Sequence, residues 1–412
     1  MINEAIILAG GLGTRLRESV PDLPKCMAPV AGRPFLFYVI NYLRSQGITR
    51  FIFSVGYKHE IIESWLAEQF PTLDYVSVIE EEPLGTGGAI RHAGKAAQGK
   101  TVLITNGDTL YKIDLPHLET LHAKNNADCT IALKPMEDFD RYGVVALDEN
   151  NRVVSFKEKQ FYQSGLINGG TYLLNMPGFL HSMHAEKFSF EQDYLEKNEH
   201  AIYGCPQDAY FIDIGVPDDF LRAQKELLQP ALHVSNVDPT WTLFIDRDGV
   251  INQEKKDGYI LSKEDFRFMD GVKESFATLA ARFGNIIVVS NQRGIGKGLM
   301  TETELTGIHE GMQKAIEEAG GRIDKIYYCT VNNDKDPNRK PNPGMAFLAK
   351  KDLSSIDLSK SLMVGNKLTD MQFGRNAGMY TVYLKTTHPE QALPHPDIDL
   401  AFDSLADFAK AL

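Results

Sequence analysis

Short runs of apolar residues alternate along the chain with longer stretches in which apolar residues recur at helical spacing. In the first half, the apolar runs AIILAG, RFIFSVG, TVLITNGD and CTIALKP alternate with the helical patterns of residues 34–47 and 59–70. Runs of this length predict strands, and the longer periodic stretches predict amphipathic helices. The alternation predicts an α/β fold in which a mainly parallel sheet is covered by helices on both faces.

This alternation is interrupted between residues 226 and 241. The sequence there, ELLQPALHVSNVDPTW, contains two prolines together with Ser, Asn and Asp. A second series of strand and helix patterns follows, from TLFIDRDG to TVYLKT. The pattern predicts two doubly wound α/β domains, residues 1–228 and 241–412, joined by a linker at 229–240.

Composition and charge restrict the kind of partner. The chain has 412 residues and a formal net charge of −12, from 43 basic and 55 acidic residues. An acidic balance disfavours nucleic acid and anionic membrane surfaces as main partners, whereas a small anionic substrate needs only a few local cations. The four cysteines form no CxxC pair, and the apolar run near the N-terminus is too short for a signal sequence. We therefore expect a cytoplasmic protein that acts on small molecules; a homo-oligomer is left open.

The first strand runs into a glycine-rich turn, ILAGGLGTRLR, which contains Gly10, Gly11 and Gly13. Glycines let backbone N–H groups approach a phosphate, although a tight turn without a ligand would also use them. The turn is not the dinucleotide fingerprint, because Leu16 stands where a third glycine is needed. Two cations, Arg15 and Lys25, follow it, and a glycine turn with two cations suits a triphosphate.

Together, LAGGLGTRLR and PKCMAPVAGRP resemble the signature of the sugar-1-phosphate nucleotidylyltransferases, with Cys26 as a mild departure. EEPLGTGGAI, NGD, FKEK, INGGTY and YFIDIGVPDDF follow in the family's order, so the resemblance covers residues 1 to about 225. It implies a Rossmann-like nucleotide-diphospho-sugar transferase domain. It also implies substrate contacts by Leu8, Gly10, Gly11, Gly13, Thr14, Glu82, Gly87, Glu158, Lys159, Asn168 and Gly169.

The two aspartates Asp108 and Asp213 each follow an apolar run, so the first lies at the carboxyl edge of the predicted sheet. Each alone would more often be a turn residue or a helix cap. The resemblance makes them ligands of one Mg²⁺, a cation that prefers carboxylate and phosphate oxygens. The implied reaction is in-line attack of a sugar 1-phosphate on a nucleoside triphosphate, with Arg15 on the leaving pyrophosphate and Lys25 and Lys159 on the attacking side.

The second half opens with another acidic pair, Asp246 and Asp248, in TLFIDRDGVIN. On a strand both carboxylates would lie on one face, about 6.6 Å apart. Two bare charges at that distance repel by about 2.5 kcal/mol at an effective dielectric constant of 20. A pair of helix N-caps is the simpler explanation, but the rest of the sequence favours a catalytic pair.

The segment FIDRDGVIN resembles the D-x-D-G motif of haloacid-dehalogenase-type phosphatases. IIVVSNQRGIGKG supplies Ser290, NRKPNPGM supplies Lys340, and LMVGNKLTDM resembles the fourth motif. The resemblance implies a Rossmann-like domain with little or no cap, in which Asp246 is the nucleophile and Asp248 the acid–base. Ser290 and Lys340 hold the phosphoryl group. The implied Mg²⁺ ligands are Asp246, Asp248, Asn366 and Asp370.

One position departs from that family. Asn366 stands where the fourth motif usually has an aspartate. We expect either weaker binding of Mg²⁺ or a larger share for Asp370, and a non-catalytic domain stays an alternative.

Within the superfamily, the motifs most resemble heptose-bisphosphate and histidinol-phosphate phosphatases. Those enzymes often carry a Cys/His zinc loop before RKP, whereas this chain has Cys329 alone, so we expect no zinc. Asn291, Arg293 and Arg339 are the candidate substrate contacts, the two arginines for a second phosphate.

The two halves suggest consecutive reactions. Heptose 1,7-bisphosphate would lose its 7-phosphate, and the heptose 1-phosphate would receive GMP from GTP to give GDP-heptose. Guanine is implied by the resemblance of the N-terminal half to guanylyltransferases of the D-glycero-α-D-manno-heptose route. One alternative is a mannose- or other hexose-1-phosphate guanylyltransferase fused to a phosphatase of different specificity. The other is a non-catalytic C-terminal module that serves binding or dimerisation.

Overall fold

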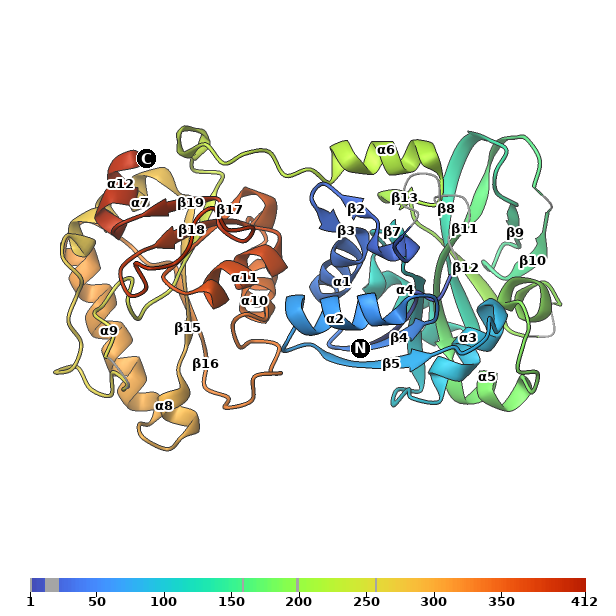
Figure 1. The fold of residues 1–412 in the computed structure, drawn as a ribbon, viewed down its shortest axis with the longest axis horizontal. Helices are drawn as coiled ribbons and strands as arrows, with labels where there is room; N and C mark the ends of the chain where they lie inside the picture. Colours follow the sequence, from blue (N-terminus) through green and yellow to red (C-terminus); the bar gives the residue numbers. More distant parts are fainter. Residues whose placement is uncertain (1, 12–21, 158, 198–199, 256–257) are drawn as a thin grey trace. The chain divides into compact units, whose positions relative to one another are not determined.

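The computed structural model describes residues 2–11, 22–157, 159–197, 200–255 and 258–412. The chain divides into two compact units, Met1–Gln229 and Pro230–Leu412, which are described here one at a time (Figure 1). Residues from Pro230 onward belong to the second unit because Leu232 and Val237 are buried in its core. Within the segment expected to be a linker, residues 229–240, these two side chains are buried, Val234 is half-buried and the others are exposed.

The first unit is built on a seven-stranded mixed sheet with the order β12-β8-β11-β6-β1-β4-β5. Its strands are β1 Glu4–Leu8, β2 Pro29–Val30, β3 Arg33–Pro34, β4 Arg50–Val55, β5 Asp74–Ile79, β6 Thr101–Asn106, β7 Thr109–Tyr111, β8 Cys129–Phe139, β9 Val145–Leu147, β10 Val153–Phe156, β11 Tyr162–Asn175, β12 Ile202–Pro206 and β13 Phe211–Asp213. Its helices are α1 Phe35–Ser45, α2 His59–Gln69, α3 Gly85–Gly94, α4 Leu115–Lys124, α5 Met176–Ser182 and α6 Pro217–Glu226, with short helical turns at Lys25–Met27 and Glu191–Leu195.

Alternating side chains of the central strands enter two separate cores. Ala5 and Ile7 of β1 pack in the core that contains α1, α2 and α4, whereas Ile6 packs in the core that contains α3 and α5. This alternation follows from the two-residue period of a strand. The sheet is covered on both faces, as the sequence predicts. It is not wholly parallel, however, because β11 runs antiparallel to both β6 and β8.

The second unit has a six-stranded parallel sheet with the order β16-β15-β14-β17-β18-β19. Its strands are β14 Thr242–Ile245, β15 Asn285–Asn291, β16 Lys325–Cys329, β17 Ser361–Gly365, β18 Tyr380–Leu384 and β19 Leu400–Phe402. Its helices are α7 Val272–Arg282, α8 Arg293–Gly296, α9 Glu302–Glu318, α10 Gly344–Asp352, α11 Leu368–Ala377 and α12 Leu405–Ala411, with short turns at Val234–Asn236 and Leu358–Lys360.

Two helical layers enclose this sheet as well. Leu243 and Ile245 of β14 pack against α7, α9 and α12, and Phe244 packs against α10 and α11. In the described part of this unit, the segments that follow β14 and β16 are loops without further helices or strands, so no cap domain is inserted there. The predicted α/β class is confirmed for both units.

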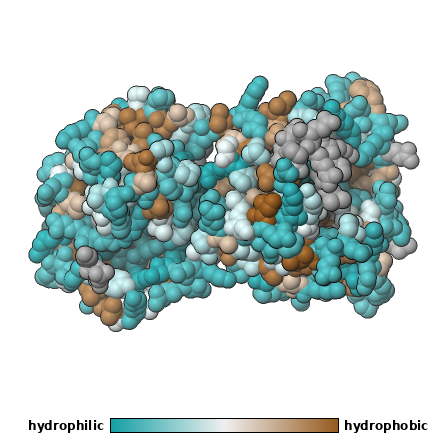
Figure 2. Space-filling model, in the orientation of Figure 1, coloured by the Kyte–Doolittle hydropathy of each residue, from teal (hydrophilic) through white to brown (hydrophobic). Residues whose placement is uncertain are grey.

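Hydrophilic residues cover most of the molecular face drawn in Figure 2, and hydrophobic residues lie among them in small groups. Among the described residues, no helix combines the length and the apolar character needed to cross a lipid bilayer.

Candidate active sites

The first site forms where the backbone brings two carboxylates together. Asp108 lies in the turn between β6 and β7, and Asp213 ends β13. Strands β7 and β13 pair antiparallel with Asp213 opposite Thr109, and the N–H of Ile214 donates to the carbonyl oxygen of Asp108 at 3.1 Å. Strand pairing thus places these two acids side by side, although 105 residues separate them in the sequence.

Lys25 lies between these carboxylates. Its ammonium group is hydrogen-bonded to Asp108 and lies 3.6 Å from Oδ1 of Asp213. Burial and the charge of Asp108 raise the pKa of Asp213, and Lys25 opposes that rise. Gly215 closes the site, because a Cβ at this position would overlap Nζ of Lys25.

A cavity of about 850 Å³ opens beside this cluster. Five of the residues predicted from sequence line it: Leu8, Gly10, Gly11, Lys25 and Asp108. A Cβ at Gly10 would lie 2.9 Å from Oε1 of Glu80, at the end of a flexible side chain, and an ordinary 3.4 Å from the backbone nitrogen of Gly56. The remaining predicted residues of this turn, Gly13, Thr14 and Arg15, lie outside the described residues, as does Glu158.

Two residues expected to bind the nucleotide do not line this cavity. Gly87 is buried, its N–H donates to the carbonyl oxygen of Phe188 at 3.1 Å, and a Cβ there would overlap the Phe188 ring. Glu82 is exposed, and its neighbour Glu81 lines the cavity instead. Gly85 and Thr86, in the first turn of α3, also line the cavity, so this segment borders it through residues other than the two predicted.

Asn168 and Gly169 form an irregularity in β11, where the pairing with β8 shifts register. The Asn168 side chain accepts from the N–H of Gly170 at 3.0 Å and donates to the Tyr172 hydroxyl at 2.9 Å. The cavity lining does not include either predicted residue. Lys159 is exposed in the segment between β10 and β11.

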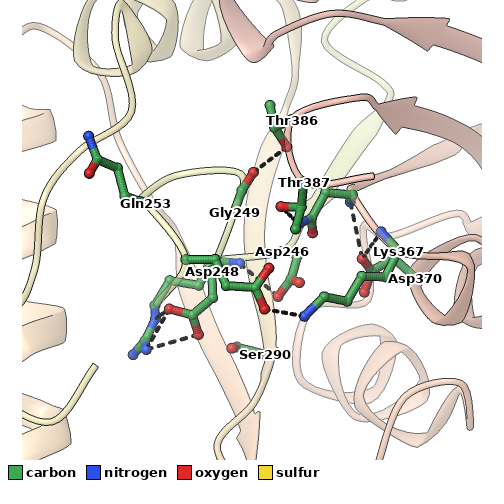
Figure 3. Close-up of polar contacts among 12 residues, drawn as sticks. Asp246, Asp248, Gly249, Gln253, Ser290, Lys367, Asp370, Thr386 and Thr387 are labelled. Carbon is green, nitrogen blue, oxygen red and sulfur yellow. Dashed lines mark hydrogen bonds and ion pairs between the residues drawn. The ribbon is translucent and has the colours of Figure 1, made fainter. Parts of the chain in front are cut away.

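The second site lies at the carboxyl ends of the parallel strands of the second unit (Figure 3). Asp246 directly follows β14, the strand between β15 and β17, and Ser290 lies near the end of β15. Lys340 precedes α10, and Asp370 lies in the first turn of α11. Four of the catalytic and metal-binding candidates therefore come together as the sequence predicts for this edge of a sheet.

A buried lysine joins two of these acids. Nζ of Lys340 lies 2.8 Å from Oδ1 of Asp246 and 2.6 Å from Oδ1 of Asp370. Burial raises the pKa of Asp246 to about 7, against the lowering effect of Lys340. The two carboxylates outweigh the burial of Lys340 and raise its pKa above the usual value, so the ammonium form is retained.

Asp248 is held by three side chains that the motif did not single out. Arg247 donates to both of its oxygens, with Nη2 at 2.9 and 3.0 Å and Nε at 3.3 Å. Asn252 donates to Oδ1 and Gln292 to Oδ2, each at 3.0 Å. Burial alone would raise the pKa of Asp248, but Arg247 and these hydrogen bonds outweigh it and lower that pKa. The pKa of Asp246 is thus raised and that of Asp248 lowered, so Asp248 ionises at a lower pH than Asp246.

Asn291 supports the lysine instead of facing a ligand. Its side-chain amide donates to the carbonyl oxygen of Lys340 and accepts from its N–H, both at 3.1 Å. Ser290 accepts from Gln292 at 2.8 Å. The sequence predicts that Asn291 contacts the substrate. Because both ends of its amide are bonded to the backbone of Lys340, Asn291 instead positions that lysine.

In the fourth motif, one buried side-chain oxygen has no hydrogen-bond partner among the described residues. Oδ2 of Asp370 accepts from the backbone N–H groups of Asn366 and Lys367 at 3.2 and 3.0 Å, and its Oδ1 is taken by Lys340. The Asn366 amide donates to Oγ1 of Thr387 at 2.6 Å, whereas its Oδ1 is buried and has no hydrogen-bond partner. Oδ1 of Asn366 therefore offers a buried ligand atom with no other partner, whereas both oxygens of Asp370 already have hydrogen-bond donors.

The two candidate phosphate-binding arginines share one acid. Arg293 and Arg339 both donate to Oδ1 of Asp334, Arg339 through Nε at 2.8 Å.

Cys329 faces Asp336, with Sγ and Oδ1 3.8 Å apart. No group of three or more His, Cys, Asp or Glu side chains suited to a metal ion occurs within the described ranges. Any metal at either site would thus need amide, backbone or phosphate oxygens as well.

Comparison with known proteins gives relatives for each unit. Residues 4–230 match the family described as nucleotidyl transferase, and residues 242–402 match that described as polynucleotide kinase 3 phosphatase. The D-glycero-alpha-D-manno-heptose 1-phosphate guanylyltransferase of Aneurinibacillus thermoaerophilus is 51% identical over 226 residues, which cover 54% of this chain and 98% of that protein.

The second unit has a relative of its own. The D-glycero-beta-D-manno-heptose-1,7-bisphosphate 7-phosphatase of Photorhabdus laumondii subsp. laumondii is 36% identical over 179 residues, 41% of this chain and 94% of that protein. Among solved structures, HddC from Yersinia pseudotuberculosis complexed with GMP-PN is 37% identical, with a TM-score of 0.51, over 55% of this chain and 100% of that chain.

Proposed function

This chain belongs to the nucleotidyl transferase family, and on that premise we propose that it is a bifunctional enzyme that makes GDP-heptose from a heptose 1,7-bisphosphate and GTP. The observation that carries the proposal is the presence of two separate acidic centres, each with a lysine ammonium group between two aspartates. Both reactions handle phosphate anions, for which such centres provide positive charge and a place for a divalent cation. We place them in the cytoplasm, where GTP is available.

In the N-terminal unit, the 1-phosphate oxygen of the sugar attacks the α-phosphorus of GTP, and pyrophosphate leaves. The cavity beside Gly10 and Gly11 would hold the nucleotide, and Lys25 would neutralise charge at the reacting phosphates. Arg15 and Glu158 keep the roles assigned from sequence as part of this proposal. The relative complexed with GMP-PN supports a guanine nucleotide here.

Mg²⁺ fits this unit because the carboxylates of Asp108 and Asp213 both face the ammonium group of Lys25, which balances their negative charge. When bound there, the ion would neutralise phosphate charge in the reaction. Lys25 would then be left to bind phosphate oxygens.

In the C-terminal unit, a carboxylate oxygen of Asp246 forms a bond to the phosphorus of the 7-phosphate as the bond to the sugar oxygen breaks. Asp248 gives that oxygen its proton. Asp248 then takes a proton from the water that attacks the aspartyl-phosphate, which releases inorganic phosphate and restores Asp246. Lys340 and Ser290 hold the phosphoryl oxygens. A bound phosphate places negative charge beside Asp248, which raises its pKa toward the range needed for the first step.

Mg²⁺ also fits this unit, because Oδ1 of Asn366 is a buried oxygen without a hydrogen-bond partner. The backbone N–H of Asn366 donates to Asp370, which Lys340 joins to Asp246. Asp246, the backbone carbonyl of Asp248 and Asn366 would hold the ion. When bound, it would offset the repulsion between the nucleophile and the phosphate.

The names of the two relatives raise a question about the sugar. The guanylyltransferase is named for the alpha anomer and the phosphatase for the beta anomer. Consecutive reactions in one chain require the same anomer at both sites. We propose the α anomer for both, since the N-terminal unit has the higher identity to its relative.

The test is mass spectrometry of products from the α- or β-heptose 1,7-bisphosphate with GTP and Mg²⁺. GDP-heptose and phosphate are expected from the α anomer. Asp246→Asn should lower the rate of phosphate release at least about a thousandfold. Lys25→Ala should lower the rate of GDP-heptose formation about a hundredfold, while phosphate release continues. Mannose 1-phosphate accepted in preference to heptose 1-phosphate would replace the heptose assignment. Phosphate release unaffected by Asp246→Asn would remove the phosphatase.

A further inference from the structure

Arg247 is a buried charge that the proposed reactions do not use. It stands between the two aspartates of the motif, and its side chain is 1% exposed. A buried guanidinium is stable only when its N–H groups are paired. The side chains that pair with Arg247 therefore indicate its role.

One edge of the Arg247 guanidinium binds Asp248, and the other faces helix α9. Nη1 lies 3.2 Å from Nε2 of His309, which is itself 5% exposed. Burial and the charge of Arg247 lower the pKa of His309 to about 4, so the imidazole is neutral. A guanidinium can only donate, so Nε2 of His309 must be the acceptor.

We propose that His309 is a positioning residue of the phosphatase site, which fixes the Asp248 carboxylate through Arg247. The inference rests on the proposed phosphatase function and adds a residue to it that lies on another helix and touches neither substrate nor metal. Three of the five side-chain hydrogen bonds to Asp248 come from Arg247. Without an acceptor for Nη1, the guanidinium would rotate toward another acceptor. The Asp248 carboxylate that is bonded to it would then move as well.

A displaced Asp248 has a chemical signature. The sugar oxygen is a poor leaving group and needs the proton of Asp248, whereas p-nitrophenolate is a stable anion and leaves without one. A small displacement of a catalytic group is enough to slow a reaction strongly. Loss of His309 should therefore lower kcat/KM, which reports formation of the aspartyl-phosphate, much more for heptose bisphosphate than for p-nitrophenyl phosphate. The later attack of water uses Asp248 as a base with both substrates, so kcat alone does not separate them. General damage to the fold would slow both alike.

The experiment uses the full chain with Mg²⁺ and measures kcat and KM for both substrates. His309→Leu should lower kcat/KM for the bisphosphate about tenfold and kcat/KM for p-nitrophenyl phosphate by less than about threefold. His309→Gln, whose amide oxygen can accept from Nη1, should restore most of the loss. Met312→Leu, a buried change of similar volume on the same helix, is the matched control.

Arg247→Lys gives an independent measurement if His309→Leu folds poorly. It keeps the positive charge but cannot bridge Asp248 and His309, so the same selective loss is expected. Equal losses of kcat/KM on both substrates, in either variant, would overturn the positioning role. A wild-type chain that releases phosphate from neither substrate would instead overturn the phosphatase function on which this role depends.

Discussion

Nζ of Lys340 and Oδ1 of Asp370 lie 2.6 Å apart, with side-chain exposures of 2% and 1%. Asp370 also accepts two backbone N–H groups, so each of its oxygens is already used. It therefore acts as the fixed counter-charge of Lys340. The lysine is in turn held in reach of Asp246, where it can meet a phosphoryl group.

The first prediction concerns the stability of this buried pair. Asp370→Asn leaves Lys340 with one carboxylate partner instead of two, and breaking a buried ion pair costs about 3 kcal/mol or more. We expect a loss of that order in the free energy of unfolding of the second unit. Urea denaturation followed by Trp241 fluorescence, in a Trp65→Phe background, would measure it, since the chain has two tryptophans.

The matched control for this measurement is Asp403→Asn. Its carboxylate pairs with Lys385 at 3.2 Å but is 81% exposed, so the change should cost less than about 1 kcal/mol. Equal losses for Asp370→Asn and Asp403→Asn would contradict the structural importance given to the buried pair.

The second prediction concerns the fourth motif. Asn366→Asp would add a negative charge at the open oxygen, and we expect Mg²⁺ or Mn²⁺ to bind about tenfold more tightly. Thr387→Val should have the opposite effect, because the Thr387 hydroxyl holds the amide so that its oxygen stays open. Titration of Mn²⁺ by electron paramagnetic resonance reads metal binding directly, without an activity assay. Unchanged affinity in both variants would exclude Asn366 as a ligand.

Residues that lie at the ends of strands are those whose position could be predicted from the sequence. In the second unit, Asp246 and Ser290 follow or end apolar runs, and the carboxyl ends of parallel strands meet at one edge, so their grouping could be predicted. In the first unit, the position of Asp108 after a strand could be predicted in the same way. The link between His309 and Arg247 joins residues 62 apart through side-chain packing, which no local pattern encodes.

The glycines illustrate the same limit. Gly87 stood in a loop rich in glycine, where a role in nucleotide binding was the natural prediction. Its absent side chain instead makes room for Phe188, which lies about a hundred residues further on in the sequence. The role of Gly215 beside Lys25 was missed for the same reason, because only the folded chain places them in contact.

The third prediction uses Gly215. A methyl group there would overlap the end of the Lys25 side chain, which is flexible and can move away at little cost. Gly215→Ala should therefore lower nucleotidyl transfer about tenfold, while the melting temperature changes by less than about 3 °C. Gly178→Ala is the control, since its Cβ would meet Asn175 at an ordinary 3.4 Å. A large fall in melting temperature with Gly215→Ala would show that the glycine is needed for folding instead.

The last prediction follows from the ionisation of His309. Its pKa is about 4 in the folded chain, compared with an ordinary value of 6.5, so the unfolded chain binds a proton in this range that the folded chain does not. The stability that depends on neutral His309 is fully present above pH 6.5 and is lost as the pH falls from there toward 4. At pH 5.5 the loss should be about 1 kcal/mol relative to pH 8. His309→Gln cannot titrate, so its second unit should lose about 1 kcal/mol less than the wild type over the same interval, measured by urea denaturation and Trp241 fluorescence. Parallel pH profiles for the two proteins would mean that His309 has the same pKa in the folded and unfolded chains. The imidazole would then be protonated at pH 5.5 beside Arg247, which would contradict its role as the acceptor for Nη1.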